Sequence, residues 1–155
     1  GLNFYFQYKG FDLTMFWQGI QGRDIISDLK KETDLWSGLN IGFLNKGRRV
    51  LDAWTPNNPD SDIPALTRSD LNNEKRVSTY YVEDGSFLKL RNIQIGYNVP
   101  EAALQKINMR KLRVYVSAQN LLTIKSRTFT GVDPENPNYG YPIPMNLTFG
   151  VNIGF

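Results

Sequence analysis

The strongest constraint on the fold is an unbroken two-residue alternation at residues 145–155. The residues between the apolar positions are polar or small, so an extended chain here has one apolar side and one polar side. A tilted strand needs about 9–11 residues to cross a bilayer, and this stretch has that length. It predicts a membrane-crossing strand with the apolar positions Met145, Leu147, Phe149, Val151, Ile153 and Phe155.

Other segments also alternate, and they predict strands at about 2–8, 11–18, 86–97 and 111–124. Between the first two, Lys9-Gly10 predicts a tight hairpin turn. The apolar residues of the third segment change parity, which predicts a bulge near Arg91-Asn92 that returns them to one face. The short, helix-prone stretch after Pro100 predicts a single helical turn.

Two long connections without strand periodicity lie at about 19–85 and 125–144. They are rich in Gly, Asn, Asp, Pro and Ser, and loops of this length are uncommon in compact domains. Outer-membrane barrels have short periplasmic turns and long extracellular loops, and the connections here run short, long, short, long. We therefore predict an all-β fold, an antiparallel transmembrane β-barrel segment in which both long connections are extracellular.

Composition removes several other classes of protein. The absence of His and Cys excludes a disulfide scaffold and thiolate metal sites, and it removes the commonest catalytic base, so we predict that the chain is not an enzyme. No apolar run is longer than about four residues, whereas a spanning helix needs roughly 20. The net charge of +3 is a small surplus and predicts no nucleic-acid partner.

About five strands cannot close a barrel, because an open edge in hydrocarbon leaves backbone N–H and C=O groups without partners. We therefore expect the working protein to contain further strands. An alternative hypothesis is a soluble or surface-tethered glycan-binding β-domain, suggested by the aromatic residues of the first long loop and by the strand count.

Several motifs in order resemble the SusC/RagA-like family of TonB-linked outer-membrane proteins. The motifs span most of the chain. The sequence departs from the family pattern at one place: before the last strand the family often carries an Arg or Pro-Arg, and this chain has Pro144-Met145-Asn146. The motifs are DAWTPNNPDSDIPAL at 52–66, STYYVEDGSFLKLRNIQIGYNVP at 78–100, LRVYVSAQNLLTI at 112–124, GVDPENP at 131–137 and YPIPMNLTFGVNIGF at 141–155.

The resemblance implies a 22-stranded barrel in the bacterial outer membrane, of which this chain would form about five C-terminal strands. It also implies import of glycans or peptides, energy delivered by TonB through an N-terminal region outside this chain, and a SusD-like surface lipoprotein over the extracellular mouth. No catalytic residue is implied.

The barrel hypothesis assigns roles to two groups of side chains. Aromatic residues of the first long loop are candidate substrate or partner contacts, with packing of the loop as the alternative: Trp36, Trp54, Tyr80 and Tyr81. Polar residues of the last two strands are predicted to face the barrel lumen: Arg113, Tyr115, Ser117, Gln119, Asn146, Thr148 and Asn152.

A terminal aromatic after alternating apolar residues resembles the signal read by the outer-membrane insertion machinery. The residues are Phe149, Val151, Ile153 and Phe155, with a lipid-facing anchor as the simpler role. Asp60 and Asp62 offer oxygen ligands for Ca²⁺, but the spacing lacks the glycine and distal glutamate of a calcium loop, so we predict no metal and no cofactor. A small basic cluster is predicted to be a solvated periplasmic turn: Lys106, Arg110, Lys111 and Arg113.

Overall fold

The computed structural model describes residues 1–35, 45–69, 73–105, 108–137 and 140–155. The chain forms two compact units, each assembled from separated segments. The strand unit contains residues 1–21, 86–125 and 143–155, and the loop unit contains residues 22–85 and 126–142. In the described part of the chain, no helix is long and apolar enough to cross a membrane.

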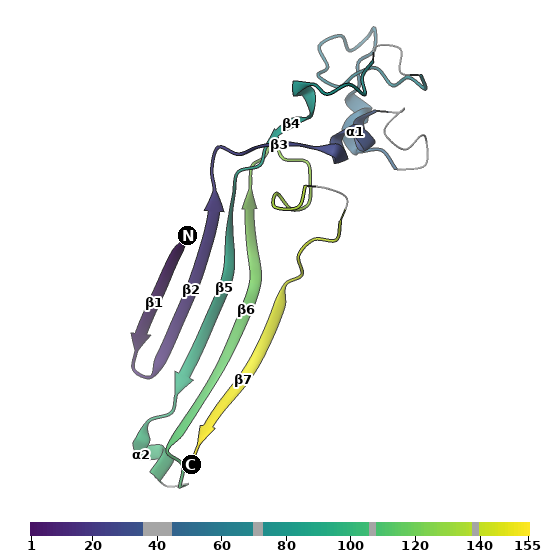
Figure 1. The fold of residues 1–155 in the computed structure, drawn as a ribbon. Helices are drawn as coiled ribbons and strands as arrows, with labels where there is room; N and C mark the ends of the chain where they lie inside the picture. The colour runs from purple at the N-terminus through teal and green to yellow at the C-terminus, as the bar shows by residue number, and fades with distance from the viewer. Residues whose placement is uncertain (36–44, 70–72, 106–107, 138–139) are drawn as a thin grey trace. The chain divides into compact units, whose positions relative to one another are not determined.

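The strand unit is one antiparallel sheet of five strands in the order β1-β2-β5-β6-β7, visible in Figure 1 as long arrows lying side by side. Each strand begins and ends at or close to the residues expected from the alternation. The strands are β1 Leu2–Tyr8, β2 Phe11–Ile20, β5 Phe87–Asn98, β6 Lys111–Lys125 and β7 Asn146–Gly154.

The pairing register gives this sheet two chemically different faces, because residues paired across strands point to the same side. One row across all five strands is wholly apolar: Phe6, Leu13, Ile95, Val116 and Phe149. A neighbouring row on the opposite face is polar: Tyr5, Thr14, Gln94, Ser117 and Thr148. The antiparallel sheet with one apolar and one polar face that the alternation predicts is therefore present.

The predicted bulge lies at Arg91. Leu90 pairs with Trp17 and Leu122, whereas Asn92 pairs with Phe16 and Gln119, so Arg91 is the extra residue of β5. Its side chain lies between the adjacent strands, with Nε donating to Gln18 Oε1 at 2.9 Å and Nη1 donating to Asn120 Oδ1 at 3.4 Å. The bulge is confirmed, and it explains how the apolar residues of β5 change parity yet share a face.

Short connections close one end of the strands. Lys9 and Gly10 have φ of 46° and 88°, the positive values that a two-residue type I′ hairpin turn requires, so the predicted tight turn is confirmed. The helical turn predicted after Pro100 is α2, Glu101–Leu104, which connects β5 to β6.

The loop unit is more ordered than the sequence analysis expected. Its longer segment contains a two-stranded antiparallel sheet and several short helices, where the prediction for 19–85 was an unpatterned connection. The sequence analysis did not predict these elements, because they are too short to produce a periodic signal. They are β3 Asp24–Ile26, α1 Asp28–Asp34, η1 Arg48–Asp52, η2 Thr79–Tyr81 and β4 Val82–Asp84.

Long-range hydrogen bonds hold the loop unit together. The backbone N–H of Ser27 donates to the carbonyl oxygen of Tyr81 at 2.8 Å, which joins the start of α1 to η2. Thr130 Oγ1 donates to Glu83 Oε1 at 2.8 Å, which ties residues 126–142 to β4. The loop unit is therefore held together by hydrogen bonds between distant residues and not by strands or helices with a periodic apolar face.

Two glycines let long side chains lie flat on the polar face of the strand unit. A Cβ at Gly150 would stand 2.2 Å from Cζ of Tyr115, its partner across β6 and β7. A Cβ at Gly96 would stand 2.4 Å from Nη2 of Arg113. Any larger residue at either position would displace the neighbouring side chain.

Replacing Gly150 with Val should lower the free energy of unfolding of the full-length protein by about 1–3 kcal/mol, the usual cost of overpacking. Chemical unfolding followed by tryptophan fluorescence would measure it. In a Tyr115→Ala background the same replacement should cost much less, because the clashing ring is gone. Equal costs in both backgrounds would contradict the proposed contact.

Candidate functional site

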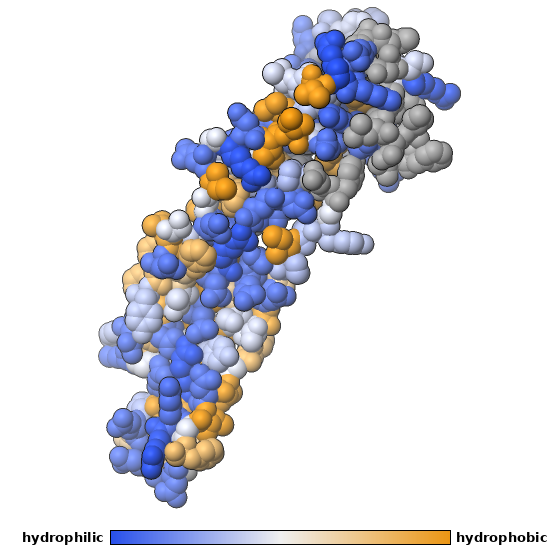
Figure 2. Space-filling model, in the orientation of Figure 1, coloured by the Kyte–Doolittle hydropathy of each residue, from blue (hydrophilic) through white to orange (hydrophobic). Residues whose placement is uncertain are grey.

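The polar face of the strand unit gathers all of the residues that the sequence predicted to line the lumen. Arg113, Ser117 and Gln119 pair across β6 and β7 with Asn152, Thr148 and Asn146, and Tyr115 pairs with Gly150. Figure 2 shows hydrophilic side chains running along the middle of the strand unit, with hydrophobic ones at its margins. The common face is thus established by register, and its exposure to a lumen remains a prediction.

An ion pair crosses this face near the end with the short turns. Arg113 Nη2 donates to Asp12 Oδ1 at 2.6 Å, and Nε donates to Oδ2 at 3.0 Å, so the contact is bidentate. Asn98 Nδ2 donates to the same Oδ2 at 3.0 Å and to the carbonyl oxygen of Gly10 at 3.3 Å. The cluster links β2, β5 and β6, and Gly96 between them leaves room for the guanidinium.

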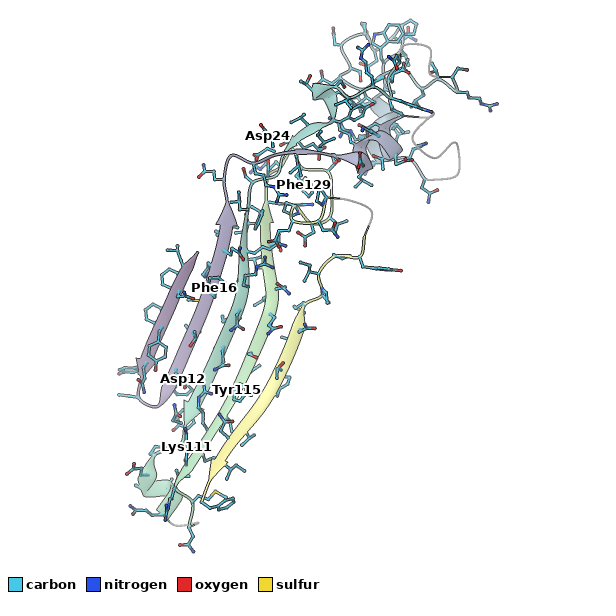
Figure 3. The ribbon with its side chains drawn as sticks, viewed as in Figure 1. Asp12, Phe16, Asp24, Lys111, Tyr115 and Phe129 are labelled. Carbon is cyan, nitrogen blue, oxygen red and sulfur yellow. The ribbon has the colours of Figure 1, made fainter. Side chains whose placement is uncertain are left out.

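Tyr115 extends the cluster toward β7. Its ring centroid lies 5.2 Å from Cζ of Arg113, within the range of a cation–π contact. Figure 3 shows Asp12 on β2 and Tyr115 on β6, with Lys111 closer to the end of the strands where α2 lies. The sequence analysis identified Arg113 and Tyr115 but missed Asp12 and Asn98. The sequence could have indicated both residues, because Asp12 and Asn98 lie at polar positions of alternating strands.

The opposite face of the strand unit presents its apolar side chains outward. Phe149 is 79% exposed, and the next two apolar residues of β7, Val151 and Ile153, are also exposed. Phe155 follows directly after β7 and is 80% exposed. Toward the short turns, the rings of Phe11 and Tyr97 lie 4.6 Å apart. The residues predicted as an assembly signal therefore form one exposed apolar row, although nothing in the geometry tests recognition by the insertion machinery.

The loop unit contains a cavity of about 530 Å³ lined by three of the four aromatic residues predicted to contact substrate or partner: Trp54, Tyr80 and Tyr81. Trp36 lies outside the described residues. Trp54 is 42% exposed, whereas Tyr81 is 2% exposed and its hydroxyl donates to the carbonyl oxygen of Glu74 at 2.5 Å. Trp54 is therefore the more accessible of the two rings.

Tyr80 is held by charged neighbours. Its hydroxyl donates to Asp34 Oδ2 at 2.7 Å, and Lys30 Nζ lies 4.0 Å from its ring centroid. Burial, the hydrogen bond to Asp34 and the charge of that carboxylate raise the pKa of the Tyr80 hydroxyl above its ordinary value. Burial also lowers the pKa of the Lys30 ammonium, with Arg49 contributing. These contacts give Tyr80 a structural role in the loop unit.

The two candidate calcium ligands, Asp60 and Asp62, lie in the loop unit. Asp62 lines the cavity, and Asp60 is an exposed residue of the turn before it. Within the described ranges, no three Asp, Glu, His or Cys side chains gather in a group that could hold a metal ion.

Removing one partner of the ion pair should destabilise the protein. Asp12→Ala should lower the free energy of unfolding by about 1.5–3 kcal/mol, because Arg113 loses two charge-assisted hydrogen bonds. The double variant Asp12→Ala/Arg113→Ala should cost less than the sum of the single variants in a double-mutant cycle. Ser117→Ala, on the same face, is the control with an expected change within about 0.5 kcal/mol. Strict additivity would rule out the coupling.

Comparison with known proteins gives consistent relatives, although no protein-family model matches the chain. TonB-dependent receptor P3 of Formosa agariphila is 34% identical over 100% of this chain, and TonB-dependent receptor P26 of the same organism is 31% identical over 96%. Each match covers 16% of the relative, so the chain spans about one sixth of their length.

Solved structures agree with these relatives. The RagAB peptide transporter matches 96% of this chain and 16% of the solved chain, with 30% identity and a TM-score of 0.74. The RagAB peptide importer in its open-open state matches the same shares at the same identity, with a TM-score of 0.76. Both likenesses extend over nearly the whole chain and include its two-faced sheet. The chain therefore belongs to the SusC/RagA-like family of TonB-dependent proteins and is a β-barrel segment of the bacterial outer membrane.

Proposed function

We propose that this chain supplies about five C-terminal wall strands and two extracellular loops of a 22-stranded barrel that imports nutrients in a TonB-dependent manner. The observation that carries the proposal is the two-faced sheet, with an exposed apolar row on one side and the Asp12–Arg113 cluster on the other. A lipid-facing exterior and a polar interior need this arrangement.

The exposed apolar face favours the barrel hypothesis over the soluble glycan-binding β-domain. A soluble glycan-binding β-domain would bury this face beneath a second layer, because large exposed apolar patches are rare on soluble monomers. Phe149, Val151 and Ile153 are exposed instead, which favours a bilayer as their environment. The relatives are receptors and transporters, which supports a role without enzyme chemistry and without a cofactor.

We assign the substrate to short peptides or glycans. The peptide alternative is supported by the 30% identity to the RagAB peptide importer. The glycan alternative is supported by Trp54, since an exposed aromatic ring beside a cavity with polar and charged lining can stack on a sugar. Energy would come from TonB through a region outside this chain.

The loop unit is the proposed contact for substrate and for a SusD-like surface lipoprotein. Its cavity has an apolar wall at Ile63 and Pro64 and charged side chains at Asp62 and Arg76, a combination that suits a polar oligomer or a protein loop. The exposed row ending at Phe155 would serve the outer-membrane insertion machinery during assembly.

Uptake by cells tests the import proposal. Cells expressing the full-length protein should accumulate fluorescently labelled peptides or glycans, and accumulation should disappear in a strain without TonB. The two substrate classes are supplied separately, so the assay also chooses between them. Trp54→Ala should reduce uptake without reducing the amount of protein in the outer membrane. Equal accumulation with and without TonB would contradict the proposal.

A charge on the apolar face should oppose membrane folding. Phe149→Arg should lower the free energy of unfolding by about 2–4 kcal/mol, the cost of an arginine facing lipid near the bilayer midplane. The matched variant Thr148→Arg places the same charge one residue away on the polar face and should be tolerated better. The fraction of folded protein would be measured on SDS gels of the outer-membrane fraction, where a folded barrel migrates differently before and after heating. Equal losses would refute the assignment of faces.

A further inference from the structure

A second cavity lies at the end of the strand unit that carries the short turns. Its volume is about 500 Å³, and we refer to it as the basic notch. Among the described residues of its lining, three carry a positive charge and one carries a negative charge: Lys9, Arg110 and Lys111 against Glu101. This leaves two positive charges in excess, so electrostatics favours an anion.

Backbone hydrogen bonds hold the two parts of the chain that carry the cations, the β1–β2 turn and the start of β6. The N–H of Asn98 donates to the carbonyl oxygen of Gly10 at 2.8 Å, which fixes the β1–β2 turn beside the end of β5. The N–H of Arg110 donates to the carbonyl oxygen of Gly154 at 2.9 Å, which fixes the start of β6 beside β7. Leu104 of α2 is 2% exposed and lines the same cavity. The cations are therefore carried by an ordered frame.

Lys9 is an unusual choice for its position. Its φ of 46° is left-handed, a conformation that disfavours lysine and suits glycine or asparagine at the first central position of a type I′ turn. Its Nζ lies 5.2 Å from the ring centroid of Tyr8, an aromatic residue on the apolar face of β1. The lysine ammonium thus lies where the apolar face ends and the turn begins.

A shallow apolar groove of about 290 Å³ lies on the apolar face of the strand unit, and its lining starts at residues next in sequence to those of the basic notch. The two cavities are adjacent in sequence on two strands: Phe11 follows Gly10, and Tyr97 precedes Asn98. The groove continues along the exposed apolar face, and nearly all of its exposed lining is apolar: Phe11, Ile95, Tyr97, Val114, Val116 and Phe149. A ligand that filled both cavities would need an anionic group joined to a hydrocarbon chain.

We propose that the basic notch and the groove together bind an anionic phospholipid at the short-turn rim of the barrel. Its phosphate would be paired with Lys9, Arg110 and Lys111, and one acyl chain would lie against Phe11 and Tyr97. The site is separate from substrate import, and it depends only on the apolar face lying in the bilayer.

Lipid retention by the full-length protein tests the site. The protein is delipidated in detergent, phosphatidylglycerol is titrated, and native mass spectrometry counts bound lipids. Since each cation near a membrane surface contributes about 1 kcal/mol to anionic lipid binding, Lys9→Asn should weaken binding about fivefold. The triple variant Lys9→Asn/Arg110→Gln/Lys111→Gln should weaken it about 100-fold. Asparagine suits the turn, so the single variant leaves the hairpin intact.

Two controls separate the site from general charge effects. Arg68→Gln/Lys75→Gln/Arg127→Gln removes the same charge from the loop unit and should leave binding unchanged. Inorganic phosphate and a diacylglycerol of the same chain length should each bind far more weakly than the phospholipid. The proposal is overturned if the two triple variants lose lipid equally, or if phosphate alone binds as tightly as the lipid. Substrate uptake reports separately on import.

Discussion

The hydrogen-bonded register of the five antiparallel strands is the constraint on which the rest of the structure depends. Side chains alternate at every residue, so a shift of one residue in any pair would move polar groups to the apolar side. The register aligns Leu13, Ile95 and Val116 in one row and Thr14, Gln94 and Ser117 in the next. Both the two-faced character of the sheet and the polar cluster follow from this alignment.

The bulge at Arg91 shows how the chain keeps the register consistent along strands that carry irregular sequence. Without an extra residue, Leu88 and Leu90 would face the opposite side from Ile93 and Ile95. Asn120 on β6 has a φ of 53° beside the same point, so two adjacent strands are irregular together. The Arg91 side chain bonds to Gln18 and Asn120 on both sides and so links the three strands there.

Local sequence patterns predicted the strands, but they could not predict which distant residues contact each other. The alternation at 145–155, the Lys9-Gly10 turn and the parity change near Arg91 are each visible within a dozen residues. Asp12 and Arg113 lie 101 residues apart, and their pairing depends on the order β2-β5-β6, which no local window contains. The loop unit was hardest to predict, because short elements such as β3 are fixed by distant hydrogen bonds rather than by periodic burial.

Gly96 and Gly150 determine how far two long side chains rise above the polar face of the strand unit. Because neither carries a Cβ, the Arg113 guanidinium and the Tyr115 ring lie across the sheet instead of standing upright on it. Two of the largest side chains of this face therefore occupy little height above the backbone. In the proposed barrel, where this face is the inner one, the low profile would enlarge the free cross-section next to these strands, and the two glycines would set the local clearance.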